Sequence, residues 1–212
     1  EISRSNLVAT RELSDPSQAD VSDMATAVYP GSFNPPTVAH LAISEAVISQ
    51  YEIDQVVWAV SRVALGKENV SIPTFEHRVA VLEEVAEEHE WLQIRVTDSQ
   101  LLADIAVGYD LLVMGADKWH QIQDPIFYEG DPAVRDSSIA TLPELAIVTR
   151  EPFQAPPTQE LRLPQNMNSV SSSEARDGLT SLMLGPAQRF DELTGAWSDT
   201  RRYQLWLTGK TD

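Results

Sequence analysis

The sequence of 212 residues contains no cysteine. Disulfide bridges and thiolate metal sites are therefore excluded, and this absence suits a reducing cytoplasm, where we expect the protein to reside. Basic side chains are scarce, because 15 Lys and Arg residues stand against 32 Asp and Glu residues, a formal net charge of -17. Surfaces that bind nucleic acids neutralise phosphates, so this balance argues against a nucleic-acid partner. We expect the excess acidic residues to form a solvated surface.

Long apolar runs are absent as well. No apolar segment approaches the ~20 residues needed to span a bilayer, and no basic-then-apolar signal segment begins the sequence. We therefore expect no membrane partner. The hydrophobic share of 42% is nevertheless typical of a folded globular protein. The pattern predicts a polar N-terminal arm over residues 1–23 and one domain over residues 24–212, which ends in a helical tail at about 187–207.

Short strands of the buried type alternate with helical patterns along the domain. Strands are predicted at residues 25–29, 55–61, 92–96, 110–117 and 144–150. A helical pattern covers residues 40–51, and Thr74 is a candidate cap for the next helix. The alternation predicts an α/β fold with a parallel sheet and helices on both faces. In such folds, ligands bind beyond the carboxyl ends of the strands, near the point where the strand order reverses.

The loop after the first strand, within "AVYPGSFNPPTVAH" (27–40), has the features of a phosphate site. Gly31 lets the backbone turn tightly, so that main-chain N–H groups can face a phosphate. Thr37 and His40 share one face of the first helical turn, where the helix dipole favours anions. A hydroxyl and an imidazole there can donate to a phosphate. The alternative interpretation is an ordinary proline-containing turn, with Thr37 as a helix cap and His40 as a packed or surface histidine.

Three short segments resemble a known family. "GSFNPPTVAH" (31–40) is similar to the first signature of the nucleotidyltransferase superfamily of adenylyl- and cytidylyltransferases, and "VSSSEAR" (170–176) is similar to the second. "MGAD" (114–117) resembles the G-A-D turn of its nicotinate/nicotinamide mononucleotide adenylyltransferases, and "HRVAVLEE" (77–84) resembles their second helix. The segments occur in the family's order between about residues 25 and 185. The resemblance implies a single Rossmann-like nucleotidyltransferase domain.

The resemblance also implies a role for each matching residue. His40 would contact the α- or β-phosphate in the transition state, Thr37 would assist it, and Arg176 would clamp the triphosphate. Lys67 would approach the phosphate of the acceptor, and Trp119 would stack on a pyridine ring. The alternatives are a solvated loop lysine, a core tryptophan and, for Asp117, a helix cap instead of a ribose contact. Contacts to the nucleotide are implied for Gly31, Ser32, Phe33, Gly115, Asp117, Ser172 and Ser173.

The implied reaction needs no protein nucleophile. The phosphate of a mononucleotide attacks the α-phosphorus of a nucleoside triphosphate and expels pyrophosphate. Mg²⁺ would bridge the phosphates, held mainly by substrate oxygens and water and not by protein ligands. The subgroup transfers AMP from ATP to nicotinate or nicotinamide mononucleotide in NAD biosynthesis. Its members often associate, which leaves a homo-oligomer open.

Two alternatives to this function stay open. Residues 97–110 form a short segment and lack the Tyr/Ser-Thr element with which the subgroup helps to bind the pyridine ring. A different phosphorylated acceptor, or CTP as the donor, is therefore an alternative. A nucleotide-binding module without turnover is another. Thr37, His40 and Arg176 together argue against such a module, because it would have no chemical need for all three.

Overall fold

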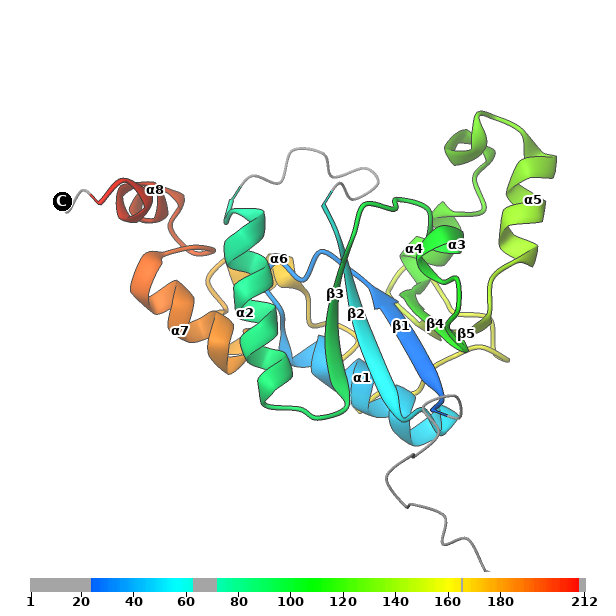
Figure 1. Cartoon of the computed structure of the whole chain (residues 1–212), viewed down its shortest axis with the longest axis horizontal. Coiled ribbons are helices and arrows are strands. Elements are labelled where there is room, and N and C mark those ends of the chain that lie inside the picture. The colour runs from blue at the N-terminus through cyan, green and yellow to red at the C-terminus, as the bar shows by residue number, and fades with distance from the viewer. Residues whose placement is uncertain (1–23, 63–71, 165, 210–212) are drawn as a thin grey trace, which may run out of the picture.

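The computed structural model describes residues 24–62, 72–164 and 166–209. The predicted N-terminal arm and Lys67 lie outside these residues. Five parallel strands form one sheet in the order β3-β2-β1-β4-β5 (Figure 1). The α/β class with a parallel sheet is confirmed. The strands are β1 (Thr26–Pro30), β2 (Gln55–Ser61), β3 (Leu92–Thr97), β4 (Leu111–Gly115) and β5 (Glu144–Val148).

The strands are apolar on both faces, and each face belongs to a separate core. On β4, Leu111 and Val113 contribute to one core, while Leu112 and Met114 contribute to the other. Successive side chains of a strand point to opposite faces, so a strand buried on both faces reads as a continuous apolar run. The predicted helices on both faces of the sheet are therefore confirmed.

Different helices complete the two cores (Figure 1). Helices α1 (Val38–Tyr51) and α2 (Phe75–Glu87) bury Val47 and Leu82 in the first core. The second core receives Ala116 from α4 (Ala116–Gln121) and partly buried side chains of α3 (Leu102–Ile105). The 3-10 helix η2 (Pro125–Tyr128) and α5 (Pro132–Ala140) follow on that side. Thr74 caps α2, as predicted, by accepting a hydrogen bond from the N–H of His77 at 3.3 Å.

Two strands are shorter than predicted. The predicted strand 110–117 ends at Gly115, because Ala116 already begins α4. A Cβ on Gly115 would lie 2.3 Å from Oδ1 of Asp117, so a larger residue here would make the Asp117 carboxylate turn away from its present position. The predicted strand 144–150 ends at Val148, and Arg150 instead pairs with Phe153 in a small loop.

The predicted helical tail consists of two helices rather than one. Helix α7 (Gly185–Thr194) ends at Gly195, which has a φ of 74° in the left-handed region. Helix α8 (Thr200–Thr208) follows, and its buried Tyr203 accepts a hydrogen bond from the Thr74 N–H at 3.0 Å. Both helices thereby cover the outer side of α2. Along the chain, α6 (Ser172–Arg176) and the 3-10 helix η3 (Thr180–Leu182) lie between β5 and α7.

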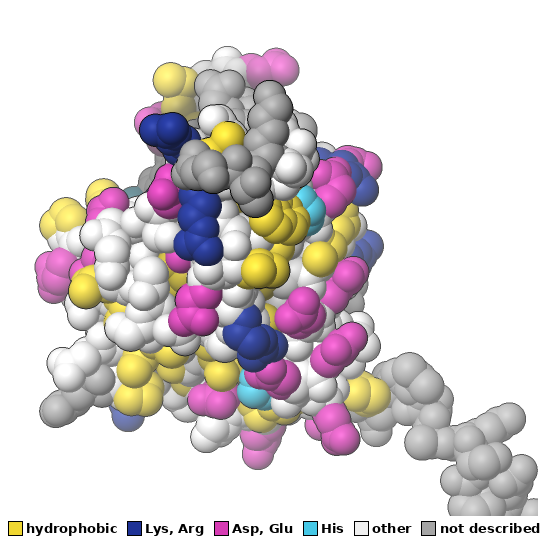
Figure 2. Space-filling model, turned by 90° about the vertical axis from the view of Figure 1, so that its left-hand side faces the viewer, with side chains coloured by type: hydrophobic (Ala, Val, Ile, Leu, Met, Phe, Trp, Pro, Cys, Tyr) yellow, Lys and Arg dark blue, Asp and Glu magenta, His cyan; other side chains and the backbone are white. Residues whose placement is uncertain are grey.

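Acidic side chains are spread over the face formed by α2, α7 and α8, with basic ones among them (Figure 2). The guanidinium of Arg189 on α7 lies 3.5 Å from Glu84 on α2 and 3.7 Å from Glu88, the residue directly after that helix. The carboxylates on this face are therefore distributed over the surface and do not form a single block. Within the described parts of the chain, no helix combines the length and apolar character needed to cross a membrane.

Candidate active site

A pocket of about 390 Å³ opens at the carboxyl ends of β1 and β4. The strand order reverses between these two strands, so the pocket lies at the switch point where α/β sheets bind ligands. Its volume is in the usual range for small-molecule sites, roughly 300–1,000 Å³. Among its lining residues, the structure brings together these sequence-predicted ones: Gly31, Ser32, Phe33, His40, Gly115, Asp117, Ser172, Ser173 and Arg176.

His40 is oriented by Thr37. The Thr37 backbone N–H donates to Nδ1 of His40 at 2.9 Å, and the Thr37 Oγ1 lies 2.9 Å from the same nitrogen. Because Nδ1 accepts a hydrogen bond, the proton of the neutral imidazole belongs on Nε2. Thr37 is fully buried and does not line the pocket. Its place in the site is therefore behind the imidazole, which it holds in one tautomer.

Aromatic rings support the same imidazole from the sheet side. The Phe33 ring centroid lies 5.0 Å from that of His40 and stacks on Trp58 at 4.6 Å. Trp58 Nε1 donates to the Ser44 hydroxyl at 2.9 Å, and that hydroxyl donates to the His40 carbonyl at 3.0 Å. The first turn of α1 is thus fixed to β2 through ring packing and a buried hydrogen-bond chain.

Gly31 has a different role from the predicted one. Its N–H donates to the Ala59 carbonyl at 3.0 Å, so this amide extends the sheet and is not directed at a phosphate. A Cβ at this position would lie 2.9 Å from the Phe33 ring. Glycine is therefore required by the approach of that ring. The carbonyl of Ser32 accepts a hydrogen bond from the buried Arg78 at 3.2 Å, which holds the loop from the side of α2.

The two signature segments touch each other. The Ser172 hydroxyl donates to the Pro35 carbonyl at 2.8 Å across 137 residues of sequence. The Arg176 guanidinium donates to the Asn34 carbonyl and, at 3.0 Å, to the Ser173 hydroxyl. These contacts join the start of α6 to the loop before α1, so that His40 and Arg176 line one pocket.

Asn34 also connects this junction to the C-terminal helices. The Trp197 indole N–H donates to Asn34 Oδ1 at 2.6 Å, and both residues are buried. The carboxylate of Asp191 on α7 accepts hydrogen bonds from the backbone N–H groups of Trp197 and Ser198, at 2.7 and 3.0 Å. The link between α7 and α8 is therefore held rigidly where it supports Asn34.

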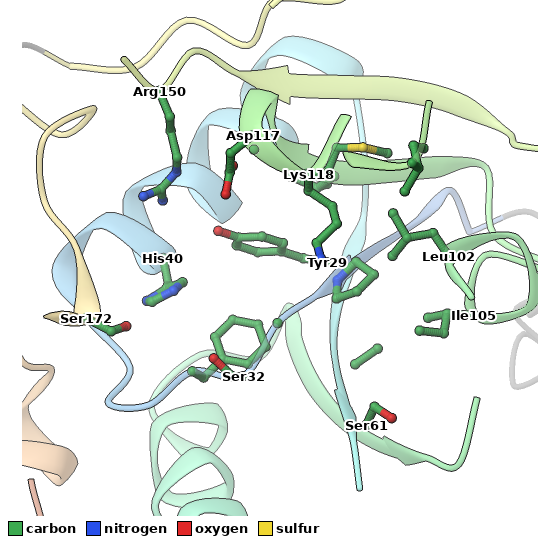
Figure 3. Close-up of a pocket in the computed structure, with 18 of the residues that line it drawn as sticks. Tyr29, Ser32, His40, Ser61, Leu102, Ile105, Asp117, Lys118, Arg150 and Ser172 are labelled. Carbon is green, nitrogen blue, oxygen red and sulfur yellow. The ribbon is translucent and has the colours of Figure 1, made fainter. Parts of the chain in front are cut away.

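Arg150 is a pocket residue that the sequence analysis missed. It follows β5, lines the pocket and points toward the side where His40 and Tyr29 lie (Figure 3). Burial raises the pKa of Tyr29 to about 12, and the nearby Arg150 opposes this shift. Tyr29 is therefore a hydrogen-bond donor at neutral pH and not a base. The available signal was a basic residue at the carboxyl end of a predicted strand, at the edge where the ligand binds.

Of the two predicted acceptor-binding residues, the structure describes only Trp119. Lys67 lies outside the described residues. Trp119 is on α4 but does not line the pocket, and its partly buried ring packs against the second core of the sheet. The alternative interpretation, a tryptophan of the core, therefore describes the position of Trp119 better than stacking on a ligand. Its neighbour Lys118 lines the pocket instead.

A second hollow of about 520 Å³ adjoins the first one. The two share Asp117, Arg150 and Ser171 as lining residues. Within the described chain, no three His, Asp or Glu side chains form a group that could hold a metal ion. Asp117 is the one carboxylate among the described residues that line the first pocket. The remaining lining residues of the second hollow are Thr149, Glu151, Phe153, Asn168 and Ser169.

The sequence profile of one family matches most of the chain. It is the cytidylyltransferase-like family, and the match covers residues 28–178, from β1 to the end of the second signature segment. Among characterised relatives, the chain is similar to the probable nicotinate-nucleotide adenylyltransferase of Salinibacter ruber (strain DSM 13855 / M31). The two are 38% identical over 64 residues, which are 30% of this chain and 33% of that protein.

A solved structure has a similar fold. It is the Plasmodium falciparum nicotinic acid mononucleotide adenylyltransferase complexed with APC, with a TM-score of 0.52 to this chain. The match covers 88% of this chain and 96% of the other, at 15% sequence identity. At this identity the likeness concerns the fold.

Proposed function

The chain belongs to the cytidylyltransferase-like family of nucleotidyltransferases, and from this premise we propose that it transfers AMP from ATP to nicotinate mononucleotide and releases pyrophosphate. One observation carries the proposal: His40, Arg150 and Arg176 come from three distant parts of the chain and line a single pocket at the switch point of the sheet. Both relatives named above are adenylyltransferases of nicotinate mononucleotide by name, which supports the choice of acceptor.

A triphosphate suits the polar end of this pocket. Arg150 and Arg176 supply two guanidinium groups, which can bind phosphate oxygens in a bidentate manner. The positive end of the α1 dipole and the Nε2–H of His40 face the same region. In a protein with a net charge of -17, this local concentration of donors is the feature that attracts an anionic ligand.

Catalysis then requires positioning and charge stabilisation. The acceptor phosphate attacks the α-phosphorus in line, the bond from that phosphorus to the β-bridging oxygen breaks, and pyrophosphate leaves. Nε2–H of His40 donates to the phosphate oxygens on which charge accumulates, while Thr37 keeps the imidazole in the donating tautomer. The Tyr29 hydroxyl stays protonated and is a further donor beside Arg150.

Mg²⁺ fits this arrangement when substrates hold it. The ion keeps several waters and usually takes one or two carboxylates together with substrate phosphates. Asp117 is the carboxylate that the described part of the pocket offers. When bound, the ion would neutralise charge on the phosphates. His40 and the two arginines would orient the same phosphates from the protein side.

The two hollows suit different parts of the two substrates. The second hollow combines acceptors, donors and a ring, which suits a nucleobase with its ribose, and Asp117 stands at its border with the first. The apolar end of the first pocket suits the pyridine ring of the acceptor. The phosphates of both substrates would then meet between the hollows, at Arg150 and His40.

Pyrophosphate release, measured across a panel of donors and acceptors, tests the proposal. With Mg²⁺ present, we expect ATP and nicotinate mononucleotide to give the highest kcat/KM in a panel that includes CTP and other phosphorylated acceptors. Without Mg²⁺ the rate should fall to background. A higher kcat/KM with CTP, or pyrophosphate release only with a non-pyridine acceptor, would contradict the proposal.

A further inference from the structure

We propose that Lys118 selects the acid form of the acceptor, by pairing its ammonium with the carboxylate of the pyridine ring. This inference rests on the proposed function and assigns the specificity of that site to one residue. It follows from the position of Lys118 in the pocket and from the character of the walls around it.

The pocket has two chemically different ends, separated by the Tyr29 ring (Figure 3). His40, Arg150 and Ser172 lie on one side of that ring. The other side is lined by α3, by Ile122 directly after α4, and by η2. Its large apolar lining residues are Leu101, Leu102, Ile105, Ile122, Phe127 and Tyr128. Such walls fit a flat ring and offer it little besides van der Waals contact.

Lys118 brings a positive charge to this apolar end. The residue lies on the first turn of α4 and is half-buried. Its side chain enters the pocket on the side of Leu102, away from Arg150 (Figure 3). The ammonium donates to Oε1 of Gln121 on the same helix, a contact that keeps the side chain along α4. The phosphates, by contrast, have Arg150 and Arg176 at the other end.

A carboxylate and a carboxamide on the ring would experience this ammonium very differently. The carboxylate forms a charge-assisted hydrogen bond, which is roughly twice as strong as a neutral one. Apolar walls strengthen the attraction, because they lower the local dielectric constant and exclude water. The amide gains only a neutral hydrogen bond and leaves the ammonium partly desolvated. A preference for the acid of about tenfold or more is expected from such a difference.

The test compares nicotinate mononucleotide with nicotinamide mononucleotide, using ATP and Mg²⁺, in four proteins. We expect the wild-type protein to have a higher kcat/KM for the acid. Lys118→Met should reduce that ratio by about tenfold or more, mainly by raising KM for the acid. Lys118→Arg keeps a cation and should retain most of the preference. Arg189→Met is the matched control, because it removes an exposed cation on α7 and should leave the ratio unchanged.

The outcomes separate this inference from the proposed function. If Lys118→Met keeps the wild-type ratio, or lowers kcat/KM equally for both acceptors, the assignment of Lys118 is overturned while the proposed function stands. If the wild-type protein releases pyrophosphate with neither mononucleotide, the proposed function fails. In that case, calorimetry measures the affinity of the wild-type protein for each of the two mononucleotides. Equal affinities would overturn the inference about Lys118.

Discussion

The polar and apolar ends of the pocket are built in different ways. At the polar end, hydrogen bonds join segments that are far apart in sequence: Ser172 to Pro35, and Arg176 and Trp197 to Asn34. At the apolar end, the large aliphatic and aromatic side chains that the pocket exposes come from one stretch of the chain, residues 101–128. Phosphate chemistry needs fixed donors, whereas an apolar wall needs only the right shape.

Side chains near the two ends also differ in their exposure to solvent. Thr37 and Asn34, at the polar end, are buried and hydrogen-bonded. Around the apolar end, Val107 after α3, Ile126 on η2 and Val134 on α5 are at least half exposed, at 74%, 71% and 50%. The comparison indicates a polar end with little tolerance for substitution, whereas the exposed residues that surround the apolar end can be substituted more freely.

The largest effect is expected from His40→Ala. Loss of a donor to charge that develops in the transition state costs ~10²–10³ in turnover. ATP affinity should stay within a few-fold, because the interaction is weak in the ground state. Assays of turnover and of ATP binding measure the two quantities, with His89→Ala, two residues beyond the end of α2, as a control. Folded His40→Ala protein with wild-type turnover would remove His40 from catalysis.

Arg176→Ala should have the next largest effect. A bidentate clamp also holds the ground state, so both ATP binding and turnover should weaken, each by about tenfold or more. Arg176→Lys should recover only part of the loss, because an ammonium does not reproduce the planar fork. Isothermal calorimetry with ATP and Mg²⁺ is the measurement. A pure turnover defect with unchanged ATP affinity would contradict the clamp.

Trp197→Phe tests whether distant packing supports the polar end. The substitution keeps a ring but removes the indole N–H, so the buried Oδ1 of Asn34 loses its donor, at a cost of about 1–3 kcal/mol. We expect kcat/KM for ATP to fall by roughly tenfold. Trp206→Phe, in the same aromatic cluster, should lower thermal stability without this kinetic change. Equal kinetic effects in the two variants would show that Trp197 acts through general stability.

Tyr29→Phe should have the smallest effect, since this ring lies between the two ends. Turnover at neutral pH should change only a few-fold, because Arg150 remains. The pKa of Tyr29 is raised from 10.0 to about 12, so the unfolded chain ionises first as the pH rises. The wild-type protein should therefore lose up to roughly 2–3 kcal/mol of stability between pH 10 and 12, a loss absent from Tyr29→Phe. Urea unfolding at pH 9 and 11 checks this.

Much of the fold could be predicted from local patterns. The five strands, the helices after the first two of them and the cap at Thr74 were all visible as apolar periodicity and capping residues. The break in the tail at Gly195 was missed, because both helices carry apolar residues with helical spacing and one glycine is a weak stop signal. The sequence-based prediction extended two strands about two residues too far, because the chain turns after Gly115 and Val148 although the next residues are apolar or follow an apolar run.

Neighbouring residues along the chain therefore determined the elements of this protein, and they underlie the prediction of a phosphate site in the loop before His40. Contacts between distant residues determined the rest: the use of the Gly31 amide by the sheet, the entry of Arg150 and Lys118 into the pocket, and the support of Asn34 by Trp197. Periodicity and capping depend on side chains a few positions apart, so a sequence records them directly. A hydrogen bond across 163 residues depends on how whole helices pack, and no local pattern encodes it.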